Sequence, residues 1–172
     1  VISFDEKVIP TYYKTLALVD ESVKELRSVS HDLMPRAVYR KGLAVSLAEI
    51  VDKIDYNRLR VHLNVEGITP QLDSNIQLMV YRIIQECISN VIKHADATKL
   101  DISLIQENDF LHGTIEDNGI GFDSEKGTPV SGLGFENIRT RILFLKGELD
   151  ISSQPGKGTL IAFHIPVKRI EL

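Results

Sequence analysis

The sequence has little cysteine, no long apolar run and no cluster of charge of one sign. Its single cysteine, Cys87, excludes a disulfide within the chain and favours a reducing compartment. No stretch approaches the roughly 18 apolar residues that a membrane-spanning helix needs. The net charge is -4, with lysine and arginine scattered among aspartate and glutamate. We therefore expect no nucleic-acid partner, because such proteins usually present a clustered basic surface.

The start of the chain also lacks a methionine and a signal-peptide pattern. We therefore expect the sequence to be a piece of a longer protein that begins before Val1. Its 172 residues, 43 % of them hydrophobic, suffice for one domain with an attached helical segment. If the whole protein is a membrane sensor, its spanning region lies outside this sequence.

Hydrophobic periodicity predicts an α+β fold preceded by a long helix. Apolar residues at spacings of three and four predict helices over residues 11–35, 42–57, 73–94 and 135–146. Alternating residues predict strands over 59–65, 99–106, 110–117, 148–153 and 159–166. Because strands and helices do not alternate strictly, we expect a two-layer α/β sandwich with the helices on one face of a mixed sheet. The long helix is expected to be a separate element, which divides the chain into residues 1–35 and 36–172.

The predicted helix 73–94 carries four polar residues in an otherwise apolar pattern, namely Glu86, Asn90, Lys93 and His94. At about 100° per residue, they fall within an arc of roughly 100° and share one face. A carboxylate, an amide, an ammonium and an imidazole can together hold a metal ion and a polyphosphate. The solvated side of an ordinary amphipathic helix is the alternative interpretation.

Two glycine-containing segments are also candidates for ligand binding. Asp117 ends a predicted strand, and Gly119 and Gly121 after it allow a sharp turn and the close approach of a ligand. The Asp117 carboxylate can accept a hydrogen bond from an exocyclic amine, although an ordinary Asp-Asn-Gly turn is the alternative. Gly132 and Gly134 come directly before the predicted helix 135–146, where backbone N–H groups can bind phosphate. These glycines match neither a Walker loop nor a dinucleotide fingerprint, and they are also typical of loop hinges.

The last motif lies between the final two predicted strands. The string GKGT (156–159) is either a simple hairpin turn or a turn that places Thr159 against a nucleotide base. No single motif distinguishes a ligand-binding site from an ordinary turn or helix face. Four such motifs in this order are far more specific for a binding site.

The ordered motifs resemble the GHKL ATPase superfamily, and in particular histidine kinases of the nitrate-sensor and desaturase-sensor type. The strings that carry the resemblance are YRIIQECISNVIKHADAT (81–98), EDNGIGF (116–122), SGLGFENIRTRI (131–142) and SQPGKGTLIAFHIP (153–166). They are similar to the N box, the two glycine boxes and the terminal Gly-Thr of that family. The resemblance covers about residues 36–168. The string ELRSVSHDLMP (25–35) resembles the second helix of the subfamily's dimerisation domain.

This resemblance implies the Bergerat (GHKL) fold and an ATP-dependent histidine kinase. The kinase would use ATP with Mg²⁺ and transfer the γ-phosphoryl group to a histidine, for relay to the receiver domain of a response regulator. The full-length protein would be a homodimer, attached to the membrane only through a missing N-terminal region, with this part in the cytoplasm. Residues 1–35 would then hold part of the dimerisation and phosphotransfer region, and 36–172 the catalytic domain.

The resemblance also implies a role for each motif residue. Asn90 would coordinate the Mg²⁺ that bridges the ATP phosphates, and Glu86 would be the catalytic acid near the γ-phosphate. Asp117 would bind the adenine amino group, with support from Thr159. The remaining ATP-binding positions are Lys93, His94, Gly119, Gly121, Gly132, Leu133 and Gly134. Residues 122–131 would form the ATP lid. The chain departs from the family in Phe135, where leucine or methionine is usual, so we expect altered packing rather than lost binding.

The phosphorylated histidine is expected to lie outside this sequence. His31 precedes Asp32, as in commoner histidine kinases, but the resembled subfamily carries its acceptor in a string like DLHD on the first dimerisation helix. No such string precedes residue 25, so we expect His31 to be a structural or interdomain residue. The main alternatives for the whole chain are a GHKL serine kinase of the anti-sigma-factor type, a nucleotide-dependent switch, and a nucleotide-binding scaffold without turnover.

Overall fold

The computed structural model describes residues 36–69, 71–123 and 133–167. The predicted helix 11–35, with His31, lies outside these residues. The helices are α2 (Arg36–Lys41), α3 (Leu43–Val51), α4 (Ser74–Asn90), the π-helix η1 (Val91–Ala95) and α5 (Leu133–Phe144). The strands are β1 (Arg60–Glu66), β2 (Lys99–Glu107), β3 (Phe110–Asp117), β4 (Glu148–Ser153) and β5 (Thr159–Pro166). Among the helices in the described ranges, none is long and apolar enough to cross a membrane.

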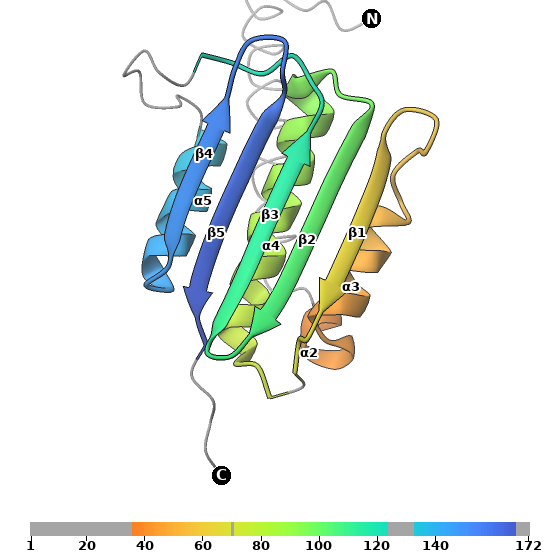
Figure 1. Cartoon of the computed structure of the whole chain (residues 1–172). Coiled ribbons are helices and arrows are strands. Elements are labelled where there is room, and N and C mark those ends of the chain that lie inside the picture. The colour runs from red at the N-terminus through yellow and green to blue at the C-terminus, as the bar shows by residue number, and fades with distance from the viewer. Residues whose placement is uncertain (1–35, 70, 124–132, 168–172) are drawn as a thin grey trace, which may run out of the picture. The chain divides into compact units, whose positions relative to one another are not determined.

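The five strands form one mixed sheet in the order β1-β2-β3-β5-β4. β1 and β2 are parallel, and every other neighbouring pair is antiparallel. The helices α3, α4 and α5 all lie on the same side of the sheet (Figure 1). The predicted α+β sandwich with helices on one face is therefore confirmed.

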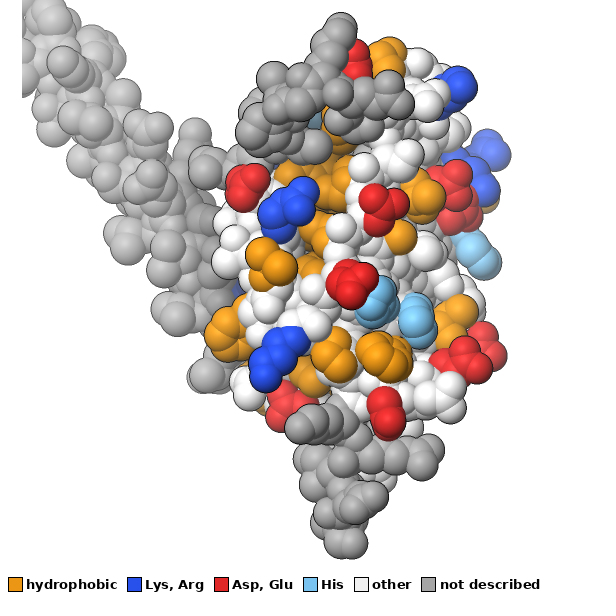
Figure 2. Space-filling view, turned by 60° about the vertical axis from the view of Figure 1, so that its left-hand side comes forward, with side chains coloured by type: hydrophobic (Ala, Val, Ile, Leu, Met, Phe, Trp, Pro, Cys, Tyr) orange, Lys and Arg blue, Asp and Glu red, His pale blue; other side chains and the backbone are white. Residues whose placement is uncertain are grey.

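The strands bury alternate side chains because successive residues of a strand point to opposite faces. In β3, Leu111 and Ile115 are buried under the helices, whereas Phe110 and His112 are exposed on the other face. On this uncovered face, His112 lies opposite His164 of β5, with ring centroids 6.2 Å apart. Figure 2 shows histidine side chains beside hydrophobic and acidic ones on this side of the molecule.

The helix α4 is the main element that packs on the sheet. Asp73 caps its first turn, since the Asp73 carboxylate accepts hydrogen bonds from the backbone N–H groups of Asn75 (2.8 Å) and Ile76 (3.2 Å). Ile83 and Ile84 are fully buried. Burial of one such side chain stabilises the fold by about 1.5–3 kcal/mol. The apolar side of α4 is therefore held against the sheet, and the opposite side is left for polar residues.

The predicted helix 42–57 begins where expected but ends too late. The short helix α2 precedes it, and Gly42 separates the two helices in a left-handed conformation (φ 81°). The helix α3 ends at Val51, where the backbone tightens and Ile54 N–H donates to the Val51 carbonyl at 3.0 Å. Apolar periodicity continues to Ile54 because this side chain still packs against the core after the helix has ended.

The end of α5 also differs from the expectation that Gly147 is its C-cap. Lys146 adopts the left-handed conformation (φ 56°), and Gly147 N–H donates to the Ile142 carbonyl at 2.9 Å. The helix therefore ends in a Schellman motif whose left-handed residue is Lys146, one position before Gly147. Gly147 is required for another reason, since a Cβ there would lie 2.5 Å from the carbonyl oxygen of His164.

Candidate functional site

A cavity opens at one end of the sheet, where β3 ends, β5 begins and α4 meets η1. These ends, together with the start of α5, all lie at the upper end of the view in Figure 1. The apolar part of the cavity wall includes Cys87, Val91, Ala95, Ile115, Ile120, Phe122, Phe135 and Ile161. Its polar side chains include Asn90, His94, Asp117 and Thr159. A largely apolar cavity with a few convergent polar groups is typical of a small-molecule site.

Asp117 is the buried acid of this cavity, with 7 % of its surface exposed. Its Oδ1 accepts a hydrogen bond from Gly119 N–H at 2.7 Å, and the carboxylate also accepts one from the backbone N–H of Thr159. Burial raises the pKa of Asp117 above its ordinary value, and the two backbone donors offset only part of that rise. A buried carboxylate at a cavity wall is suited to accept a hydrogen bond from a ligand.

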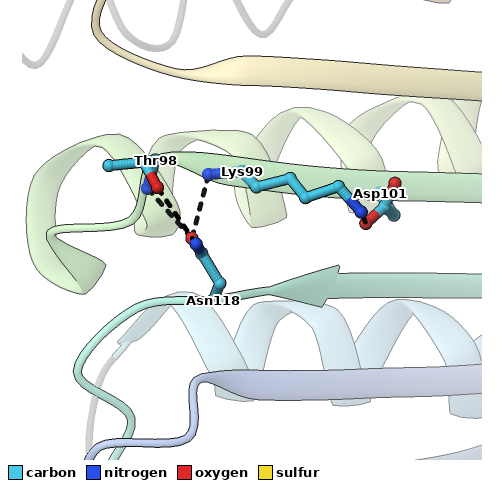
Figure 3. A network of polar contacts seen from close by, with 4 residues as sticks. All are labelled: Thr98, Lys99, Asp101 and Asn118. Carbon is cyan, nitrogen blue, oxygen red and sulfur yellow. Dashed lines mark hydrogen bonds and ion pairs between the residues drawn. The ribbon is translucent and has the colours of Figure 1, made fainter.

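Asn118 anchors the segment that follows Asp117 (Figure 3). The Asn118 Oδ1 accepts hydrogen bonds from the backbone N–H groups of Thr98 (3.0 Å) and Lys99 (2.9 Å), and its Nδ2 donates to Thr98 Oγ1 at 3.0 Å. The side chain thereby ties the end of β3 to the start of β2. Sequence reasoning treated Asn118 only as part of a possible turn and missed this role.

The glycines of the first glycine box permit close backbone contacts behind the cavity. A Cβ on Gly119 would lie 2.2 Å from the Ala95 carbonyl oxygen, and Ile120 N–H donates to that same oxygen at 2.7 Å. Gly121 has a φ of 58°, and a Cβ there would lie 2.1 Å from the Gln154 carbonyl oxygen. Gly121 lines the cavity, and Gly119 lies behind Asp117.

The first turn of α5 contacts the polar face of α4. A Cβ on Gly134 would lie 2.5 Å from Glu86 Oε1 and 2.9 Å from Asn90 Oδ1. The Nδ2 of Asn90 is buried and has no hydrogen-bond partner among the described residues. The beginning of α5, the Glu86 carboxylate and the Asn90 amide thus come together beside the cavity. Gly132 and the side chain of Leu133 lie outside the described residues, so the rest of the second glycine box cannot be compared with the expectation.

The two basic residues expected on the same face separate in the structure. The α-helix ends at Asn90, and residues Val91–Ala95 form a π-helix, whose wider turn rotates each residue by less than an α-helix does. Both side chains are exposed, but only His94 is among the residues of the described part that line the cavity. The common arc predicted for Glu86, Asn90, Lys93 and His94 assumed a regular α-helix to residue 94, which the structure does not have.

Ser153 is a buried polar residue that sequence reasoning did not single out. It ends β4 with 3 % of its surface exposed, and its hydroxyl lies 3.0 Å from Thr159 Oγ1. The alternation of Leu149, Ile151 and Ser153 was a usable signal, because it places Ser153 on the same, inward face as two apolar residues.

The sequence analysis also did not predict a contact between two aromatic side chains of the cavity wall. The rings of Phe122 and Phe135 meet edge to face there, with centroids 5.6 Å apart.

Comparison with known proteins agrees with this geometry. The model of the histidine kinase-, DNA gyrase B- and HSP90-like ATPase family matches residues 75–169. The chain belongs to this ATPase family. The matched region holds the polar end of α4, the end of β3, the start of α5 and the start of β5, which are the elements that surround the cavity.

Two curated relatives of the chain are sensor histidine kinases. The chain is 37 % identical over 143 residues to ComP of Bacillus subtilis, covering 81 % of this chain and 18 % of ComP. It is 34 % identical over 144 residues to MctS of Rhizobium johnstonii, covering 82 % of this chain and 31 % of MctS. The chain thus spans less than a third of the length of either curated relative.

Among solved structures, the chain is similar to the histidine kinase domain of the blue-light activated histidine kinase of Erythrobacter litoralis. The TM-score is 0.57 at 25 % identity, and the alignment covers 73 % of this chain and 65 % of that domain. The fold expected for a GHKL domain is therefore confirmed by structure as well as by sequence.

Proposed function

We propose that this chain is the ATP-binding catalytic domain of a two-component sensor histidine kinase. The observation that carries the proposal is that one cavity joins Asn90 of α4, Asp117 of β3 and Thr159 of β5, with Glu86 and Gly134 beside it. These residues are far apart in the sequence and belong to four separate motifs. A plain turn or a solvated helix face would not require them to meet.

At the inner end of the cavity, Asp117 is proposed to bind the amino group of adenine. The apolar wall, which includes Ile115 and Ile161, offers flat surfaces to a purine ring, and the Asp117 carboxylate accepts a hydrogen bond from its exocyclic N–H. Thr159 lies opposite Asp117 in the β3–β5 register and lines the same wall. Gly119 and Gly121 serve this end indirectly, since they let the loop pack closely enough to leave the cavity open.

At the outer end, the beginning of α5 and the polar face of α4 are proposed to hold the phosphates. Backbone N–H groups of the first turn of a helix attract anions, and Gly134 lies in that turn. His94 borders the cavity and is proposed to contact a phosphate. Lys93 is proposed to act at longer range as an exposed positive charge. Gly132 and Leu133 are proposed to complete the phosphate site, as the family resemblance implies.

The residues at this end are compatible with Mg²⁺. Asn90 and Glu86 offer amide and carboxylate oxygens, the ligand types that Mg²⁺ prefers, and both oxygens lie beside Gly134 at the beginning of α5. The described residues contain no cluster of three or more His, Cys, Asp or Glu side chains that could hold a metal alone. The phosphates of ATP would therefore complete the coordination, with Asn90 as the protein ligand. When bound, Mg²⁺ supplies neutralisation of phosphate charge.

The catalytic contribution of the chain would then be positioning. Phosphoryl transfer needs orientation and charge neutralisation more than covalent chemistry by the protein. Glu86 is proposed to orient water or metal near the γ-phosphate. The acceptor is proposed to be a histidine outside this sequence, and a response-regulator receiver domain would then take the phosphoryl group from it.

The parent protein is proposed to be a dimeric kinase of the nitrate-sensor or desaturase-sensor type. The order of the motifs and the string at 25–35 support this subtype. We propose that residues 1–35 belong to its dimerisation region and that 36–172 form the catalytic domain in the cytoplasm, in line with a compact unit that begins at Ala37. Any membrane anchor would lie in another part of the protein.

Calorimetric titration of the chain with ATP, with and without Mg²⁺, tests the proposal. We expect saturable binding that Mg²⁺ strengthens, loss of binding in Asp117→Asn, and loss of the Mg²⁺ effect in Asn90→Ala. Equal affinity of Asp117→Asn and the unmodified chain would refute the adenine assignment. Incubation with labelled ATP then tests the acceptor. Acid-labile label that disappears in His31→Gln would show that His31 is the acceptor after all.

A further inference from the structure

The uncovered face of the sheet brings together two histidines that are far apart in the sequence. His112 of β3 and His164 of β5 lie directly opposite each other in the antiparallel register. Their ring centroids are 6.2 Å apart, and the rings are inclined by 36°. Figure 2 shows histidine side chains at the surface on this side of the molecule, where a solute can reach them. The pair is separate from the nucleotide cavity, whose lining residues include neither histidine.

The distance between the two rings suits two ligands of one metal ion. Zn²⁺ lies about 2.0–2.1 Å from an imidazole nitrogen and therefore about 3.2 Å from the ring centroid. Two rings on one tetrahedral Zn²⁺ have centroids about 5.2 Å apart, and about 6.4 Å is the widest separation that one ion can bridge. The observed 6.2 Å lies within that limit. His112 is exposed and the His164 side chain is 39 % exposed, so both rings have room to rotate toward each other.

Packing among aromatic rings is the alternative explanation for the pair. The ring centroid of Phe110 lies 6.2 Å from that of His112 and 5.9 Å from that of His164. Contact with this shared phenyl ring keeps the imidazoles side by side whether or not an ion is bound. Aromatic packing alone, however, gives no role to the carboxylate that lies beside one of the imidazoles.

That carboxylate belongs to Glu148 of β4, which lies opposite His164 in the register. Glu148 Oε2 is 3.6 Å from His164 Nε2. A carboxylate beside one ring nitrogen favours a proton on that nitrogen and leaves the lone pair of the other for a metal. Histidines that bind metals usually have such a carboxylate partner, which orients the ring. The arrangement around His164 therefore resembles that of a metal ligand.

We propose that His112 and His164 bind a divalent transition-metal ion such as Zn²⁺ on the uncovered face of the sheet, with Glu148 orienting His164. Imidazole is a common ligand of Zn²⁺, Cu²⁺ and Ni²⁺, whereas Mg²⁺ takes oxygen ligands. The described residues contain no group of three His, Cys, Asp or Glu side chains that could hold a metal. Water therefore completes the coordination. The inference goes beyond the proposed ATP-binding function and does not depend on it.

The test is a titration of the full 172-residue chain with zinc chloride, without nucleotide, followed by NMR of the isotope-labelled imidazole nitrogens. The signals of His112 and His164 should change together and saturate at one Zn²⁺ per chain. His164→Gln should abolish the change at His112, and His112→Gln should abolish the change at His164, because one ion needs both ligands. His62→Gln is the matched control, since His62 is exposed in β1 and lies opposite Asp101 rather than another histidine.

Several results would overturn the inference. One is a change at either histidine that persists after the other is replaced, and another is a set of changes confined to the remaining histidines. Mg²⁺ in place of Zn²⁺ should leave both signals unchanged, and an equal response to Mg²⁺ would contradict imidazole ligation. Because no nucleotide is present, none of these results depends on whether the chain binds ATP. Failure of the ATP titration would instead refute the proposed function.

A pair of acidic residues tests the part assigned to Glu148. Glu148→Gln should weaken Zn²⁺ binding roughly 10-fold, as loss of a partner that orients a metal ligand does. Asp150→Asn removes the same charge from the same strand, but Asp150 lies opposite Ala162, so its effect should be smaller. Equal affinities in the two variants would overturn the role of Glu148. Circular dichroism of every variant establishes that folded proteins are being compared.

Discussion

Replacement of Gly134 by alanine should separate the stability of the fold from its nucleotide affinity. Gly134 lies in the first turn of α5, and alanine favours a helix over glycine by about 1 kcal/mol in an interior position. The new Cβ would lie 2.5 Å from Glu86 Oε1 and 2.9 Å from Asn90 Oδ1, both of which are ends of flexible side chains. These side chains can move aside without a change of backbone, so the fold should tolerate the substitution.

The substitution should weaken nucleotide binding, because the displaced side chains are those proposed to hold Mg²⁺ and the phosphates. Loss of one well-placed polar contact typically costs about 1–2 kcal/mol, which corresponds to roughly 5- to 30-fold in affinity. We therefore expect Gly134→Ala to bind Mg-ATP roughly 5- to 30-fold more weakly, with a melting temperature equal to or above that of the unmodified chain.

Calorimetric titration gives the affinity, and thermal unfolding without nucleotide gives the stability. Thr140→Ala is the control, since Thr140 is exposed on α5 and the substitution favours the helix without approaching Glu86 or Asn90. It should leave affinity unchanged. Unchanged affinity in Gly134→Ala would refute the reasoning, and so would a loss of affinity that merely follows a loss of stability.

Three further substitutions test other parts of the account. Burial raises the pKa of Asp117, so its contribution to stability is present at low pH and is lost as pH rises through that pKa. Asp117→Asn should therefore be more stable than the unmodified chain at neutral pH, by an amount that shrinks on acidification in thermal melts. In Gly158→Ala, the Cβ would lie 1.9 Å from the Asp117 carbonyl oxygen at a φ of 76°, and urea unfolding should show a loss of about 2 kcal/mol or more. Gly156→Ala is its control, because φ is 78° there but no atom lies within 4 Å, so only the left-handed backbone costs about 1–2 kcal/mol. Asp73→Ala removes the α4 cap and should cost about 1 kcal/mol in the same assay. Equal losses for the two glycine variants, or no loss for Asp73→Ala, would contradict these contacts.

The sheet could be predicted well from the sequence because alternation reports directly on a half-buried strand. The bounds of β3 and β4 match the expectation, and those of β1 differ by one residue at each end. The ends of helices were harder to predict from the sequence. Apolar spacing indicates which residues face the core, and it does not indicate where the backbone stops being helical. Ile54 continues the apolar pattern beyond the end of α3 for this reason.

The candidate site could be predicted as a set of motifs, but its internal arrangement could not. Within the π-helix at the end of α4, His94 but not Lys93 is among the residues that line the cavity, and no periodicity at that position signals a wider turn. Ser153 and Asn118 act through hydrogen bonds to backbone groups of other elements. Such contacts depend on which strand ends lie side by side, and that follows only from the strand order of the sheet.

The most direct test of the central claim is an NMR titration that maps where ATP binds. Amide shifts of the isotope-labelled chain would be followed as Mg-ATP is added. The account predicts saturating shifts concentrated at the residues around the cavity, including Asn90, Gly119, Gly134 and Thr159. Shifts confined to another surface, or no shifts at millimolar ATP, would contradict the claim that this cavity is the nucleotide site.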